Sequence, residues 1–172
     1  MRRGYIQVYT GSGKGKTTAA LGLAVRAAGA GHRVYFAQFI KKRVCSEHKA
    51  LARFSDLITV KQFGTGFLEG PERTEAERKA AARGFDEIAS AIRSSEFDVV
   101  ILDEINIAIK AGLVEVGQLL ELLESKPSPV EVVLTGRYAD PRVVGIADLV
   151  TEMHEIKHYH NKGVKARTGI EM

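Results

Sequence analysis

A length of 172 residues predicts a single domain spanning residues 1–172, and a content of 45% hydrophobic and 27% charged residues excludes a disordered chain. The net charge is +4, but the basic residues are scattered along the sequence and form no patch with aromatic residues, so no nucleic-acid partner is expected. The sequence has one cysteine, no secretory signal and no apolar run of the roughly 20 residues that cross a membrane, which predicts a cytoplasmic protein without a membrane partner.

Segments typical of strands alternate with segments typical of helices from the N-terminus onward. Strands are expected at Tyr5–Tyr9, Arg33–Ile40, Ile58–Gly64, Phe97–Glu104, Val130–Gly136 and, last, around Leu149–Ile156. Helices are expected at Thr17–Ala30, in the charged stretch after Ile40, at Arg73–Ser94 and within Val114–Ser125. Runs such as VVIL lack polar alternation and indicate strands buried on both faces. We therefore predict an α/β fold with a mostly parallel sheet flanked by helices.

The segment TGSGKGKTT, Thr10–Thr18, follows the first expected strand and opens the first expected helix. It approximates the phosphate-binding consensus GxxxxGK[ST], with Thr10 at the position of the first glycine. Glycines let backbone N–H groups converge on phosphate oxygens, Lys16 adds a positive charge, and the Thr17 hydroxyl suits Mg²⁺. This context favours a P-loop NTPase-like nucleotide site over a plain glycine-rich turn. The residues expected to bind ATP are Gly11, Ser12, Gly13, Lys14, Gly15, Lys16, Thr17 and Thr18.

Asp103 and Glu104 end the apolar strand VVIL, at the edge of the sheet where the phosphate loop is expected. Together with Thr17 they are the predicted ligands of Mg²⁺ or Mn²⁺, the alternative being two solvated acids. Arg137 follows the next expected strand and is the candidate cation for charge on the phosphates, the alternative being a surface arginine. No Ser/His or Cys/His pair suggests a protein nucleophile.

A series of ordered blocks resembles the P-loop ATP:corrinoid adenosyltransferases, the enzymes that make adenosylcobalamin. The series starts with the phosphate loop and its helix and includes VVILDE before Leu134–Arg137. The other blocks are QFIK at Gln38–Lys41, GTGF at Gly64–Phe67, ADLVTE at Ala147–Glu152, and KHYHNKGVKARTGI at Lys157–Ile170. Because the blocks cover most of the chain, the resemblance is far more specific than a phosphate loop alone.

The resemblance implies that the Co(I) centre of a reduced corrinoid attacks the 5′ carbon of ATP and expels triphosphate, so no protein base is needed. It also implies ATP bound end-reversed relative to ordinary NTPases, a separate electron donor for the corrinoid, and a homodimer. Lys16, Glu104 and Arg137 become the expected catalytic residues, since they would stabilise the departing triphosphate directly or through the metal. Phe67 is expected to present an apolar face to the corrinoid, or otherwise to be a core residue.

Four features depart from the family pattern. Ser12 replaces a common Asn, the aromatic residue usual shortly after GTGF is absent because LEGPE follows, and the stretch between QFIK and ITVKQFG is short. Only three residues precede the region Gly4–Tyr9, so we expect no long N-terminal segment covering the corrinoid. The ATP site should therefore follow the family more closely than the corrinoid site.

The histidines and the single cysteine do not suggest a second site, and two other functions remain as alternatives. His154, His158 and His160 do not share one face of a helix or strand, which argues against a zinc site, and Cys45 is expected to be a free thiol. The alternative functions are an ordinary P-loop NTPase or kinase, and a non-catalytic sensor or carrier that binds ATP or a corrinoid.

Overall fold

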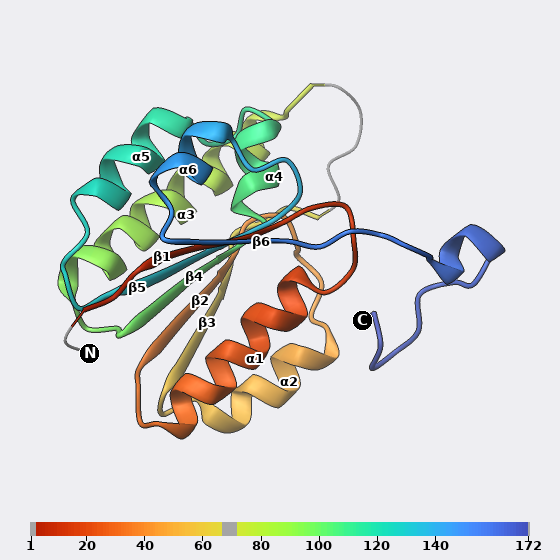
Figure 1. Ribbon diagram of the computed structural model, residues 1–172, viewed down its shortest axis with the longest axis horizontal. Coiled ribbons are helices and arrows are strands. Elements are labelled where there is room, and N and C mark those ends of the chain that lie inside the picture. Colours follow the sequence, from red (N-terminus) through yellow and green to blue (C-terminus); the bar gives the residue numbers. More distant parts are fainter. Residues whose placement is uncertain (1–2, 67–71, 172) are drawn as a thin grey trace.

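All strand pairs of the sheet are parallel in the computed structural model, which describes residues 3–66 and 72–171. Within that part of the chain the strand order is β3-β2-β4-β5-β1-β6 (Figure 1). The strands are β1 (Ile6–Thr10), β2 (Val34–Gln38), β3 (Ile58–Gln62), β4 (Val99–Asp103), β5 (Glu131–Thr135) and β6 (Leu149–Glu152). The predicted parallel α/β sheet is confirmed.

Helices cover both faces of the sheet (Figure 1). One face carries α1 (Lys16–Gly29) and α2 (Ser46–Leu51), which continues into the 3₁₀ turn η1 (Ala52–Phe54). The other face carries α3 (Glu75–Ser94), α4 (Ile105–Lys110), α5 (Val116–Glu124) and α6 (Pro141–Ile146). A second 3₁₀ turn, η2 (Tyr159–Lys162), lies in the C-terminal segment.

Two apolar clusters result from the alternation of side chains along the strands. Val99 and Ile101 of β4 join the cluster under α1, whereas Val100 and Leu102 join the cluster under α3 and α5. Successive strand residues point to opposite faces, so a run without polar residues has to be buried on both. Each buried run ends where polar residues begin, and because the strands are parallel, these polar residues lie together at the carboxyl ends of the strands.

Three elements differ from the expectations. No helix was expected at α4, whose isoleucines are more typical of a strand, and the helix buries Ile105 and Ala108 in the core. The six residues of α6 are too few for a periodic pattern, but Asp140 caps its N-terminus and Pro141 opens it. β6 ends at Glu152 instead of near Ile156, and the chain then leaves the sheet (Figure 1).

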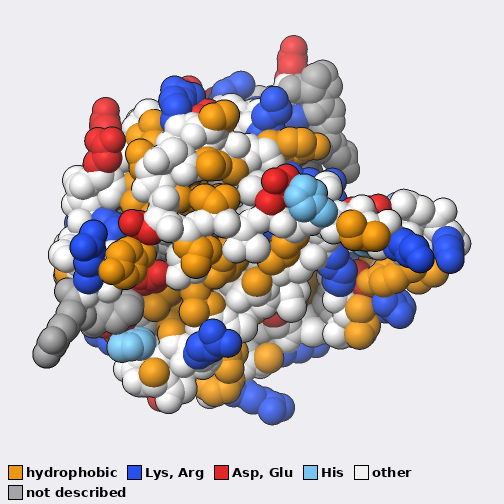
Figure 2. All heavy atoms as spheres, viewed as in Figure 1, with side chains coloured by type: hydrophobic (Ala, Val, Ile, Leu, Met, Phe, Trp, Pro, Cys, Tyr) orange, Lys and Arg blue, Asp and Glu red, His pale blue; other side chains and the backbone are white. Residues whose placement is uncertain are grey.

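The edge strand β6 pairs only with β1 in the described chain, and its four residues are exposed. Figure 2 shows hydrophobic side chains on the face of the molecule that carries β6 in Figure 1. Leu149 and Val150 of β6 are both exposed. Among the described residues, no helix has the length and apolar character needed to cross a membrane.

Candidate active site

The phosphate loop joins β1 to α1 and packs against the chain that follows β6. Gly11 and Gly15 have φ angles of 94° and 122°, in the region that favours glycine. A Cβ on Gly11 would collide with the carbonyl oxygen of Met153, and one on Gly13 would lie 2.9 Å from the same atom. The Gly13 N–H donates to that oxygen at 2.7 Å. Both the backbone angles and the lack of space therefore require glycine here.

Lys16 is folded into the loop. Its side chain is buried, and Nζ donates to the carbonyl oxygens of Gly11 at 2.8 Å and Gly13 at 2.7 Å. Burial lowers the pKa of Lys16, and the neighbouring carboxylate of Glu104 acts in the opposite direction. The ammonium is thus held at the centre of the loop, at the start of α1, where the free N–H groups and helix dipole also favour an anion.

Asp103 ends β4 and is fully buried. Its Oδ1 accepts hydrogen bonds from the hydroxyls of Thr17 at 2.8 Å and Thr135 at 2.7 Å, and its Oδ2 accepts one from Gln38 Nε2 at 3.0 Å. Three donors compensate the cost of burying the carboxylate. Because the Thr17 proton points at Asp103, the lone pairs of the Thr17 hydroxyl are left for a cation.

Glu104 follows in a left-handed backbone conformation, with φ 63° and ψ 20°, at the start of α4. Its N–H donates to the Thr135 hydroxyl at 3.0 Å, so β5 holds the strained turn in place. A Cβ on Gly136 would lie 3.2 Å from Glu104 Oε2, so glycine leaves room for the carboxylate. Burial first and the charge of Asp103 second raise the pKa of Glu104, although Lys16, Lys41 and Arg137 partly offset this.

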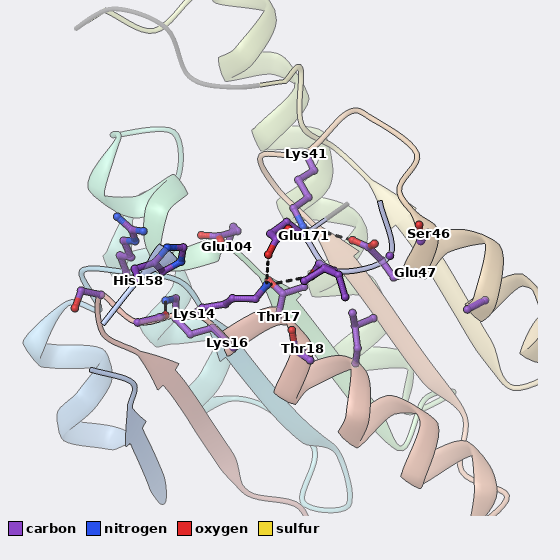
Figure 3. A pocket seen from close by; sticks show the side chains of 18 residues that line it. Lys14, Lys16, Thr17, Thr18, Lys41, Ser46, Glu47, Glu104, His158 and Glu171 are labelled. Carbon is purple, nitrogen blue, oxygen red and sulfur yellow. Dashed lines mark hydrogen bonds and ion pairs between the residues drawn. The ribbon is translucent and has the colours of Figure 1, made fainter. Parts of the chain in front are cut away.

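These groups surround a pocket of about 550 Å³ (Figure 3), a size common for small-molecule sites. Of the residues predicted for the site, the pocket is lined by Ser12, Gly13, Lys14, Gly15, Lys16, Thr17, Thr18, Glu104 and Arg137. Gly11 contributes a carbonyl to Lys16, and Asp103 lies behind Thr17. Phe67 lies outside the described residues.

A second wall of the pocket was not predicted from sequence. Lys41, at the end of the QFIK block, lies 3.5 Å from the carboxylate of Glu47, and Ser46, Glu47 and Ala50 of α2 line the pocket beside it (Figure 3). The QFIK block was the only signal for this wall. The position of α2 depends on the path of the chain after β2, which periodicity does not encode.

The third wall comes from the C-terminal segment, which returns to the phosphate loop (Figures 1 and 3). Lys14 Nζ donates to the carbonyl of Ile170 at 3.1 Å and lies 4.0 Å from the carboxylate of Glu171. Hydrogen bonds to Glu171, first from the Tyr159 hydroxyl and then from Arg167, lower its pKa to about 2. A carboxylate that stays ionised is therefore the counter-ion of Lys14. Figure 2 shows further Lys and Arg side chains on this projecting segment.

The three histidines do not come together as metal ligands. His158 lines the pocket, while His154 pairs with Glu152 at 3.6 Å. Within the described residues, the group whose side chains lie close enough for a shared metal ion is Cys45, Glu47 and His48. Cys45 is a free thiol, as expected.

The parallel sheet, the glycine-rich loop at a helix N-terminus and the buried carboxylate on β4 define a P-loop-type nucleotide-binding fold. A solved KaiC-like protein from Pyrococcus horikoshii OT3 is similar in structure, with a TM-score of 0.59 and 15% identity. The match covers 90% of this chain and 75% of that one. At this identity the likeness establishes the fold alone.

Sequence comparison goes further. The family described as ATP:corrinoid adenosyltransferase BtuR/CobO/CobP matches residues 2–172. A corrinoid adenosyltransferase of Pseudomonas aeruginosa is 35% identical, covering 98% of this chain and 84% of the relative. One from a Sinorhizobium species is 36% identical, covering 98% and 80%. The chain belongs to the ATP:corrinoid adenosyltransferase family, and the predicted family and transferase class are confirmed.

The glycine requirement in the loop gives a first prediction. Gly11→Ala places a methyl group against Met153 and forces a strained φ, so we expect ATP to bind at least about 10-fold more weakly and the protein to be less stable. Isothermal titration calorimetry measures the ATP affinity, and thermal unfolding measures the stability.

Gly22→Ala is the matched control, since Gly22 lies in α1 and a Cβ there meets nothing within 4 Å. Its ATP affinity should be unchanged and its stability higher by about 0.5–1 kcal/mol. Equal ATP affinity in both variants would contradict the account of the loop.

Proposed function

We propose that the protein transfers the 5′-deoxyadenosyl group of ATP to the Co(I) centre of a reduced corrinoid and releases inorganic triphosphate. The observation that carries this proposal is the lysine-centred phosphate loop, found in a chain that belongs to this family. The pocket offers cations and N–H groups for polyphosphate. The nucleophile is the corrinoid itself, so the protein has no need to supply one.

The protein's task in this reaction is to align two substrates and to stabilise a leaving group. The lone pair of Co(I) forms the cobalt–carbon bond as the C5′–O bond of ATP breaks, and the electrons of that bond leave on the triphosphate. The growing negative charge would be stabilised by Lys16, by Arg137, which also lines the pocket, and by the N–H groups at the start of α1. We propose that Lys16 exchanges a loop carbonyl for a phosphate oxygen when ATP binds.

The oxygen atoms around Thr17 fit a hard divalent cation. The Thr17 hydroxyl donates its proton to Asp103, and the Glu104 carboxylate faces the same pocket. We propose that Thr17 and Glu104 hold Mg²⁺ or Mn²⁺, with Asp103 orienting Thr17 from behind. Bound there, the ion would offset charge on the triphosphate.

Family membership supports a corrinoid as the second substrate. Phe67 is proposed to contact the corrinoid. The GTGF block that contains it follows β3 in the sequence, and the carboxyl ends of the parallel strands carry the pocket. The separate electron donor and the homodimer come from the resemblance alone.

Product analysis tests the reaction. Incubation with ATP and chemically reduced cobalamin should give adenosylcobalamin, seen in the absorption spectrum, and one triphosphate per product. Release of ADP without a corrinoid requirement would contradict the proposal and identify an NTPase or kinase. Binding of both ligands without turnover would identify a sensor or carrier.

Substitution of the buried lysine tests the loop's part in that reaction. Lys16→Ala should lower kcat by about 100-fold or more, because one stabilising group for the leaving charge is lost. The circular dichroism spectrum should match the parent protein. Lys42→Ala, at an exposed residue outside the pocket, is the control for loss of a positive charge. Near-normal turnover of Lys16→Ala would remove the loop from the mechanism.

A further inference from the structure

His48 lies in the first turn of α2, the helix that contributes one wall of the pocket, and both of its ring nitrogens are hydrogen-bonded. Nδ1 accepts the N–H of Cys45 at 2.9 Å, which is the helix-capping contact of α2. In a neutral imidazole the other nitrogen then carries the proton, so Nε2 donates to Gln38 Oε1 at 2.7 Å. The ring therefore has no lone pair left for a metal shared with Cys45 and Glu47.

Gln38 receives this hydrogen bond at the end of β2, where its side chain is buried. Its Oε1 accepts a second bond, from Gln62 Nε2 at 3.2 Å. Two donors at Oε1 fix the orientation of the amide. In the flipped orientation the amino group of Gln38 would face the N–H groups of His48 and Gln62, and no hydrogen bond could form. The Gln38 amino group is thereby directed at Asp103 Oδ2, 3.0 Å away.

Asp103 is the end of this chain of contacts. Gln38 occupies Oδ2, which leaves Oδ1 to accept the hydroxyls of Thr17 and Thr135. A fixed carboxylate in turn fixes the rotamer of Thr17, whose hydroxyl is one of the proposed cation ligands. Partners behind a metal ligand of this kind commonly change metal affinity by about 10–100-fold when they are removed.

We infer that His48 is a positioning residue: by donating to Gln38 it orients Asp103 and Thr17 for the metal–triphosphate complex, and it ties the α2 wall to that site. The inference rests on the proposed metal role of Thr17. It requires the Nε2–H donor of His48, and not merely a side chain that caps α2.

Two substitutions separate the donor from the cap. Glutamine and glutamate at this helix position both accept the N–H of the capping residue, as in ordinary capping boxes. Only His48→Gln also offers an N–H donor to Gln38, whereas His48→Glu offers none. His48→Met, which has neither donor nor charge, controls for the added negative charge. Lys49→Ala, at an exposed neighbour on the same helix, is the control for changes in α2 that leave the network intact.

The measurement is the dissociation constant of ATP with Mn²⁺ and without metal, by calorimetry, with thermal unfolding beside it. We expect His48→Glu and His48→Met to weaken ATP binding about 10-fold or more with Mn²⁺, and little without metal. His48→Gln and Lys49→Ala should retain the metal effect of the parent protein.

Parent-like metal dependence in His48→Glu and His48→Met would overturn the inference, as would equal losses in His48→Gln and His48→Glu. Absence of any metal effect in the parent protein would overturn it together with the metal assignment. That result would leave adenosyl transfer itself standing, because the product analysis tests it without reference to His48.

Discussion

One buried carboxylate, Asp103, joins the parts of the molecule that form the site. It accepts hydrogen bonds from Thr17 at the start of α1, from Thr135 at the end of β5, and from Gln38 at the end of β2. A charge without these donors would be costly in the core, so the three elements are held where their donors reach it. Thr17 connects Asp103 to the phosphate loop, and Thr135 connects it to the strained turn at Glu104. The helix α2 is connected to it through His48 and Gln38.

The positive charges that line the pocket suit a ligand with several negative charges, such as a triphosphate. Lys14 is held by the C-terminal segment through Ile170 and Glu171, and Lys16 is held by loop carbonyls. Both ammonium groups thus have partners that are weaker than a triphosphate. Binding of ATP would exchange these partners, which couples the loop and the C-terminal segment to the nucleotide.

The sequence was sufficient for the parts of the fold and site that rest on local chemistry. Buried apolar runs predicted the strands, and the order of glycines, Lys16 and Thr17 predicted the loop. Glu104 and Arg137 were found because polar residues that end parallel strands meet at one edge. The α2 wall and the return of the C-terminal segment were not predicted, since they depend on contacts between residues far apart in the chain, such as Lys14 with Ile170. α4 was missed because its six residues are too few to show a helical period and three of them are isoleucine, which favours strands.

A structure of the protein with bound Mg·ATP would show whether the phosphate loop holds the triphosphate. We expect the triphosphate within hydrogen-bond distance of the N–H groups of residues 13–17 and of Lys16 Nζ, with the cation beside the Thr17 hydroxyl. A nucleotide bound elsewhere, with Lys16 still donating to the carbonyls of Gly11 and Gly13, would contradict this expectation.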